Sequence, residues 1–219
     1  PGLTGGETMK LKGMEKVGDL LLTNLLFVLC SLPVVTLGAS ATAMHYVLGR
    51  IRRQEGTVTR DFFRSFRENF KQATLYWCGF LLAALALYWN FRLVSGWTGP
   101  MYSVFMVLLI LVSWFALSWV SLVFPLLSRF DNSLWTTAKN AAILVLAAPL
   151  RTLCAVILNL ILVVLALAAP GIFALVAVLW LFCLCAVSGL AIQLLLAPVF
   201  SRLEGNSEPE EDAEEPKED

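Results

Sequence analysis

Few residues of this chain have the types and spacing that catalysis or metal binding requires. The single histidine is His45, and no segment matches G-x-x-x-x-G-K-[ST], H-E-x-x-H or G-x-S-x-G. All five cysteines lie inside apolar runs, and Cys183 and Cys185, two residues apart, would project to nearly opposite faces of a helix. Their pattern indicates small core side chains rather than a metal pair or a disulfide framework. We therefore expect no catalytic residue, no cofactor and no metal, and we predict that the protein is not an enzyme.

Polar side chains inside the apolar runs are the second group with potential chemistry, because such groups are expensive to bury in a bilayer. The candidates for an intramembrane polar site are Asn24, Thr36, Ser40, Thr42, His45, Asn159, Ser188 and Gln193. Hydrogen bonding between neighbouring helices is the interpretation we favour over a substrate site. His45 has no carboxylate within the membrane that could complete a proton relay.

The stretch 61–73 reads "DFFRSFRENFKQA" and combines aromatic rings with cations. At 100° per residue, its four phenylalanines and Ala73 share an arc of about 100°, a basic ridge borders that arc, and Asp61 and Glu68 face away. This layout is typical of an in-plane helix at a membrane surface. We predict an amphipathic cytoplasmic helix over 59–72. Its predicted membrane-surface residues are Phe62, Phe63, Arg64, Phe66, Arg67, Phe70 and Lys71.

This stretch has two other conceivable uses besides a membrane-surface helix. It could dock a cytoplasmic domain of a partner, and that alternative stays open. A nucleic-acid surface is disfavoured, because the rings would have to be free for bases while the segment is tethered between membrane helices.

The elements that must position these residues are transmembrane helices. Hydrophobic residues make up 58% of the 219 positions and charged residues only 15%, against roughly 45–50% and 25% in soluble domains. The mean hydropathy is +0.77. Four runs approach or exceed the roughly 20 apolar residues that cross a bilayer, namely 73–93, 101–127, 152–169 and 171–197. The fold class we predict is an all-α transmembrane bundle of five to six membrane helices.

The start of the chain resembles a secretory signal, with lysines within 10–16, an apolar run and then small residues. Cleavage near Ala41 would leave the basic residues of 50–71 on the outer face, against the excess of Lys and Arg in cytoplasmic loops. We therefore predict a helical hairpin over about 17–53, with a turn across Pro33 to Gly38.

Two further hairpins, over about 73–130 and 141–203, complete the predicted membrane domain. With a cytoplasmic segment 1–16 and both termini inside, fifteen of the sixteen Lys and Arg residues face the cytoplasm, and only Arg92 lies outside. The apolar part of 39–53 is short for a full crossing. Two alternatives therefore stay open: this segment spans the membrane at a thinned, packed site, or it enters the membrane only part of the way.

The last residues of the chain, 204–219, differ sharply from the rest. They hold nine of the sixteen acidic residues and one lysine, for a net charge of −8 (1 minus 9), whereas the preceding 203 residues carry +8 (15 minus 7). Dense like charge without apolar periodicity predicts an acidic, solvated, disordered tail.

Three segments resemble one known family. They read N-L-L-x-x-L-C-S-L-P-V-V-T-L-G-A at 24–39, F-x-x-S-F-x-x-N-F-K-x-A at 62–73 and R-F-D-N-S at 129–133. In this order the segments resemble the YesL-like family of bacterial integral membrane proteins, over about 14–203. The resemblance implies no established biochemical activity and an association with carbohydrate ABC-transport systems.

Together these patterns predict a multi-pass protein of the bacterial inner membrane. The leading hypothesis is a non-enzymatic accessory component associated with carbohydrate (ABC-type) transport. Its expected partners are the lipid bilayer and ABC-transporter permease subunits, with no nucleic acid. The alternative is a stand-alone transporter or channel for a small solute that uses the polar groups between the hairpins.

Overall fold

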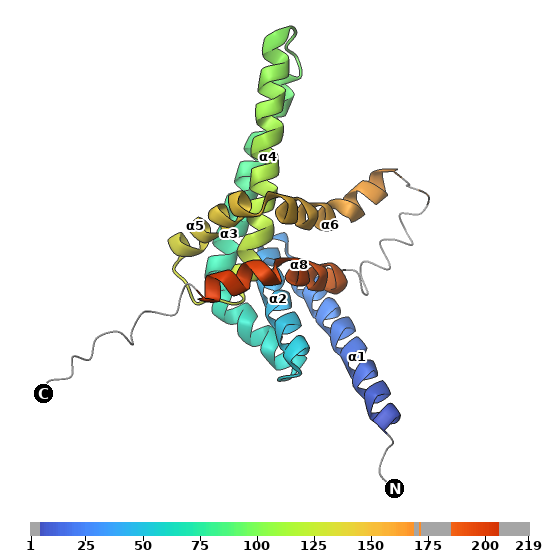
Figure 1. Cartoon of the computed structure of the whole chain (residues 1–219). Coiled ribbons are helices and arrows are strands. Elements are labelled where there is room, and N and C mark those ends of the chain that lie inside the picture. The colour runs from blue at the N-terminus through green and yellow to red at the C-terminus, as the bar shows by residue number, and fades with distance from the viewer. Residues whose placement is uncertain (1–4, 169–170, 172–184, 206–219) are drawn as a thin grey trace, which may run out of the picture.

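The structure is a computed structural model that describes residues 5–168, 171 and 185–205, and its described elements are all helical (Figure 1). The predicted all-α fold class is confirmed. In chain order the elements are α1 (Gly5–Ser31), the 3₁₀ turn η1 (Val34–Thr36), α2 (Leu37–Arg53), α3 (Val58–Val94), α4 (Pro100–Leu127), α5 (Leu134–Ala147), α6 (Pro149–Ala168) and α8 (Cys185–Gly205).

The chain reverses between α1 and α2 at the predicted proline-containing turn. Pro33 cannot donate a backbone hydrogen bond, and α1 ends two residues before it. The Thr36 hydroxyl donates to the carbonyl oxygens of Cys30 (2.5 Å) and Pro33 (2.7 Å), which closes the turn. α2 then begins at Leu37, two residues earlier than the expected 39, because η1 leads directly into it.

The segment 59–72 is the first part of a longer helix, and the prediction of a separate amphipathic helix is wrong. α3 runs for 37 residues from Val58 to Val94. Its sequence has no proline, and Gly79 is its single glycine, so nothing local ends the helix before the apolar run begins. At 1.5 Å per residue, α3 is about 55 Å long.

Two described helices are long and apolar enough to cross a membrane, namely α3 and α4. Their far halves project from the rest of the bundle as a pair (Figure 1), joined by the short connection 95–99. α5 and α6 pass the same test together but are bent by 106° at Ala148, just before Pro149, so they add at most one span. The structure therefore supports two to three candidate spans, which indicates a multi-pass membrane protein.

The prediction of five to six membrane helices in three hairpins goes further than these spans. α2 is 17 residues long and ends in a basic turn, and α8 has only a short apolar section, Cys185–Pro198. Part of the predicted third hairpin, including 172–184 with Cys183, lies outside the described residues. The same holds for 206–219 of the predicted tail.

α2 is the central helix of the bundle and contacts α1, α3, α4 and α8. Its small residues allow this, because Ala39 and Ala43 are fully buried. The closest approach is at Gly38, where an added Cβ would lie 2.5 Å from the Ala73 carbonyl oxygen and 2.9 Å from the Cβ of Trp77. α2 and the first half of α3 therefore pack nearly backbone to backbone.

Candidate functional site

Three of the predicted intramembrane polar residues join helices that are far apart in the sequence. The Asn24 side-chain oxygen on α1 accepts a hydrogen bond from the backbone N–H of Ala186 on α8 (2.9 Å). The Gln193 amide on α8 donates to the His45 carbonyl oxygen on α2 (2.5 Å). In the same way, α6 is joined to α4, where the Asn159 amide donates to the Ser121 hydroxyl (3.1 Å).

The other polar candidates bond to the backbone of their own segment. Besides Thr36 at the turn, the Ser40 hydroxyl donates to the Thr36 carbonyl oxygen (3.1 Å), and the Thr42 hydroxyl donates to that of Gly38 (3.0 Å). Ser188 donates to the Cys185 carbonyl oxygen (2.9 Å). Such bonds within one helix satisfy the hydroxyl where it is buried and leave it without a role in joining helices.

α8 meets α2 through one of its faces, on which Ala186, Gly189 and Gln193 recur at helical spacing. An added Cβ at Gly189 would lie 2.9 Å from the Met44 methyl carbon, so the two helices are close there. Beside this contact, the Nδ1 atom of His45 and the Oε1 atom of Gln193 are buried without a hydrogen-bond partner among the described residues. They are the atoms of the predicted polar set that could still bind a small polar molecule.

A second group of candidate residues lies where α2 ends and α3 begins, and an ion pair orders it. The Asp61 carboxylate lies 3.2 Å from the Nε atom of Arg50 and also accepts the backbone N–H of Thr57 (3.1 Å). Arg50 in turn donates to the Tyr46 hydroxyl (3.3 Å), and this bond, with the nearby Asp61 charge, raises the pKa of Arg50 above its ordinary value.

The connection between the two helices requires unusual backbone angles. Gln54 and Gly56 have φ values of 59° and 76°. A Cβ at Gly56 would lie 2.1 Å from the Asp61 carboxylate oxygen, so the contact of Asp61 with the turn excludes a side chain there. We call the arrangement of Arg50, Gly56, Thr57 and Asp61 the α2–α3 latch.

The prediction that Asp61 faces away from the apolar side is wrong, because this residue is only 7% exposed. The helical wheel ranks positions within one helix and does not include a cation supplied by the helix before it. The pattern that could have indicated the latch is a glycine just before the start of α3, with an acid in the first turn.

The phenylalanines of the first half of α3 divide between the protein and its surface. Phe62 is fully buried, so its predicted place on the membrane side is wrong. Phe63 and Phe70 are 48% and 37% exposed. Phe66 is half-buried, and its ring centroid lies 6.4 Å from that of Phe62 and 5.5 Å from that of Phe70. Phe62 lies on the same buried face of α3 as Ser65, and α2 packs against α3. One ring of the aromatic arc is therefore buried inside the protein.

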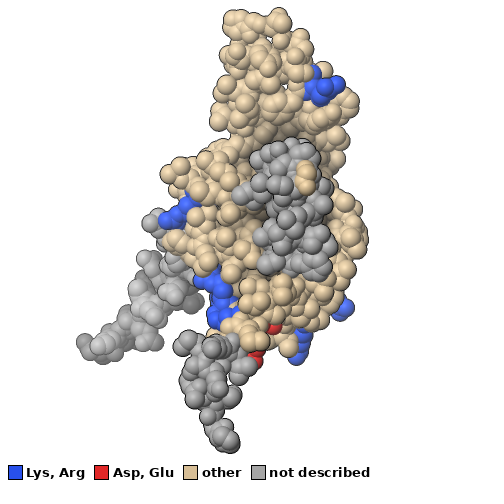
Figure 2. All heavy atoms as spheres, turned by 90° about the vertical axis from the view of Figure 1, so that its right-hand side faces the viewer, with Lys and Arg blue, Asp and Glu red and all other residues tan. Residues whose placement is uncertain are grey.

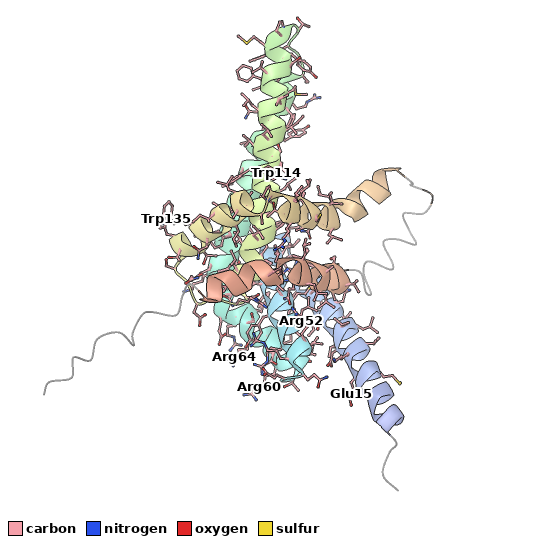
Figure 3. The ribbon with its side chains drawn as sticks, viewed as in Figure 1. Glu15, Arg52, Arg60, Arg64, Trp114 and Trp135 are labelled. Carbon is pink, nitrogen blue, oxygen red and sulfur yellow. The ribbon has the colours of Figure 1, made fainter. Side chains whose placement is uncertain are left out.

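The outer side of this segment is a continuous basic and aromatic strip. We define the basic–aromatic surface as Arg60, Phe63, Arg64, Arg67, Phe70 and Lys71. It lines two adjoining hollows of about 670 and 430 Å³, which share Phe63 and Arg67 and which Thr57, Thr59, Glu68 and Phe66 complete. Arg60 and Arg64 lie at the end of the bundle opposite the projecting α3–α4 pair (Figure 3).

The charged side chains are also distributed unevenly between the bundle and the projecting α3–α4 pair. Figure 2 shows Lys and Arg gathered around the lower half of the visible face, whereas the projecting pair is almost uniformly uncharged apart from one basic group near its tip. On the basic–aromatic surface, Arg64 donates to Glu68 (3.0 Å), and this bond raises the pKa of Arg64. The surface can therefore offer permanent positive charge beside exposed rings.

The described residues contain no group of three or more His, Cys, Asp or Glu that could hold a metal ion. The structure offers two places that could bind another molecule. These are the buried polar atoms beside the α2–α8 contact and the basic–aromatic surface on α3. Whether the basic–aromatic surface lies at a membrane stays a prediction.

Residues 20–91 match a family model described as "Protein of unknown function, DUF624". The matched segment, about a third of the chain, is similar to this family, whose function is unknown. It covers the last part of α1, all of α2 and α3 nearly to its end, and so includes the α2–α3 latch and the basic–aromatic surface. No curated protein and no solved structure matches the chain.

Proposed function

We propose that this protein is a non-enzymatic accessory component of the bacterial cell (inner) membrane, associated with carbohydrate (ABC-type) transport. In this proposal both termini are cytoplasmic and the basic–aromatic surface docks a permease subunit of the transporter. The resemblance of three sequence segments to the YesL-like family supports the partner. The excess of Lys and Arg at one end of the bundle supports the orientation.

The observation that carries the proposal is the exposed and rigidly placed basic–aromatic surface. Phe63 and Phe70 expose large parts of their rings next to three arginines. Arginine and aromatic side chains are the types that supply most binding energy at protein interfaces. The α2–α3 latch holds this segment in register with the core, which lowers the ordering cost of binding.

The same observation favours docking over lipid contact alone as the main use of the surface. An interfacial helix that serves only the bilayer would turn its whole aromatic arc to the lipid. Here Phe62 and its neighbours are used for packing, and hollows remain between the cations and the exposed rings.

Affinity purification in mild detergent tests this function. The wild-type protein is expected to retain ABC-transport subunits, and a triple variant with Arg60, Arg64 and Arg67 changed to alanine is expected to lose them. A double variant at Arg52 and Arg53, which are also exposed, controls for total charge. Absence of any ABC-transport subunit, under conditions that keep known complexes intact, contradicts the proposal.

Orientation has its own test. A cysteine introduced at Arg53 is expected to react with an impermeant thiol reagent only from the cytoplasmic side. Labelling of that cysteine in intact cells would overturn the hairpin topology on which the docking proposal depends.

A stand-alone transporter or channel is the second candidate, favoured by the buried atoms of His45 and Gln193 that have no hydrogen-bond partner in the described part of the chain. It requires solute flux in proteoliposomes that contain only this protein. Replacing Gln193 by leucine would abolish such flux, whereas the same change at Asn159, which bonds the Ser121 hydroxyl elsewhere in the bundle, would not. Flux without an ABC partner would support this candidate over the accessory role.

A further inference from the structure

The basic–aromatic surface carries positive charge that the described residues leave largely unmatched. Arg60, Arg64, Arg67 and Lys71 recur at helical spacing over twelve residues, about 16 Å of α3. The Asp61 carboxylate is engaged by the α2–α3 latch on the inner side, and Glu68 pairs with Arg64. The strip therefore has a net charge of +3 (4 minus 1) and two hollows beside it.

We propose that the acidic C-terminal segment of this same chain, residues 206–219, docks on the basic–aromatic surface. This segment contains eight acidic residues and one lysine, for a net charge of −7 (1 minus 8). Six of those acids lie within the eight residues 208–215, so their density along the chain is high enough to meet each cation of the strip. Charge complementarity thus favours this segment as the occupant.

The segment is long enough to reach the strip from the end of α8. Fourteen residues follow Gly205, and an extended chain spans about 3.3–3.6 Å per residue, or about 46–50 Å in all. From Gly205 to Gln193 along α8 is about 18 Å. Gln193 contacts His45, and from there α2 leads within two turns to Arg50, which is paired with Asp61 on α3.

The remaining steps of this path are short. Each crossing between packed helices adds about 8–10 Å, and Arg64 lies about 5 Å along α3 from Asp61. The bent path along the helix axes therefore totals about 50 Å and is an upper limit, because the segment has to cover only the shorter direct distance between its ends. Figure 1 shows α8 crossing the bundle on the half that carries α2 and the start of α3.

Tethering makes this docking effective although each contact is weak. Exposed ion pairs contribute little one by one. A short covalent connection, however, gives the segment an effective concentration of about millimolar at the strip. Since the charges are solvent-exposed, docking depends on salt, with a Debye length of about 8 Å at physiological ionic strength and about 3 Å at 1 M.

Docking of the tail would regulate the surface. A partner or an anionic headgroup must displace the segment before it can use the same cations, so the tail acts as a built-in competitor. This consequence rests on the proposed function. The docking itself does not, because it is a property of the protein alone and is measured without any partner.

The test uses the native chain in phosphatidylcholine nanodiscs, one copy per disc, where no anionic headgroup competes. A carbodiimide joins carboxylates to lysine amines that lie in contact, and mass spectrometry identifies the joined peptides. Lys71 lies in the strip, and Lys139 on α5, which is also exposed, is the reference. We expect tail adducts on Lys71 in clear excess over Lys139, lost when the salt is raised to 1 M.

A charge variant makes the test specific. Changing Arg60, Arg64 and Arg67 to glutamine leaves Lys71 as reporter and is expected to lower its tail adduct by roughly fivefold or more. The matched change of Arg52 and Arg53 to glutamine should leave that adduct unchanged. Equal adduct yields on Lys71 and Lys139, or equal losses in the two variants, would overturn the proposal.

Lipid composition separates the tail from the competing occupant. Replacing phosphatidylcholine by phosphatidylglycerol offers headgroup phosphates to the same cations. Persistence of the Lys71 adduct supports the tail as the resident occupant. Complete loss of the adduct in phosphatidylglycerol would assign the surface to anionic lipid instead. Retention of an ABC-transport subunit decides the proposed function separately, so that failure of one idea leaves the other measurable.

Discussion

The closest contact between α2 and α3 provides a quantitative test of the packing. An alanine at Gly38 would place its Cβ 2.5 Å from the Ala73 carbonyl oxygen, 2.9 Å from the Trp77 Cβ and 3.0 Å from a ring carbon of Phe124. The first two of these atoms belong to the α3 backbone or are bonded directly to it, so neither can rotate away. Since real Cβ contacts stay above 3.0 Å, the helices must separate by at least about 0.5 Å (3.0 minus 2.5).

The expected cost of this separation follows from the behaviour of overpacked cores. An added methyl group in a well-packed site destabilises by about 1–3 kcal/mol, and the rigid neighbours put Gly38 near the upper end. Replacing glycine by alanine in a helix gives back about 0.5–1 kcal/mol. The net effect of Gly38→Ala is therefore a loss of about 2 kcal/mol, which for a chain of this size lowers the melting temperature by about 4–8 °C.

Gly49 provides the matched control, because it lies in the same helix and an added Cβ there meets nothing within 4 Å. Gly49→Ala should leave the melting temperature unchanged or raise it slightly. Thermal unfolding of both variants in one detergent, followed by circular dichroism at 222 nm, measures the difference. If the two substitutions shift the midpoint by the same amount in the same direction, the close approach of α2 and α3 is refuted.

Three further predictions concern the α2–α3 latch and the polar ties. Asp61→Ala should lower thermal stability, because losing a charged hydrogen bond costs about 1.5–3 kcal/mol, whereas Glu68→Ala should have little effect because both partners of that pair are 59% exposed. Gly56→Ala should also destabilise the protein. The double variant with Asp61→Ala should lose less stability than the sum of the two single losses, because Asp61→Ala removes the carboxylate oxygen that the new Cβ meets. Additive losses would contradict the latch. Asn24→Leu should lower the melting temperature more than Asn159→Leu, because Asn24 is fully buried while the Asn159 bond is exposed, and the reverse order would contradict the tie between α1 and α8.

Local sequence patterns were sufficient for the helical type of the elements and for the position of two apolar spans. Apolar runs of membrane length occur at 73–93 and 101–127, and they coincide with the two candidate spans in α3 and α4. Pro33 made the break before α2 predictable, because proline removes a backbone donor and restricts the preceding residue. These are properties of neighbouring residues, and so they can be read along the chain.

The candidate site was predictable only in part, because its decisive contacts join distant residues. The wheel grouped Arg60, Arg64, Arg67 and Lys71 as one ridge, since their spacing alone sets that relation. It did not indicate that Asp61 would pair with Arg50 on the preceding helix. Nor did the polar residues of the apolar runs reveal their partners.

The sequence by itself determined that this chain is an all-α membrane protein with one strongly basic end and an acidic terminus, because composition, hydropathy and helical period are local quantities. The tertiary structure decided which side of α3 is available. Phe62 packs inside because α2 lies against it, at a distance that Gly38 permits, and this leaves Phe63, Phe70 and the arginines outside. A helical period defines a face, but only the neighbouring helix decides whether that face binds the protein's own core or something else.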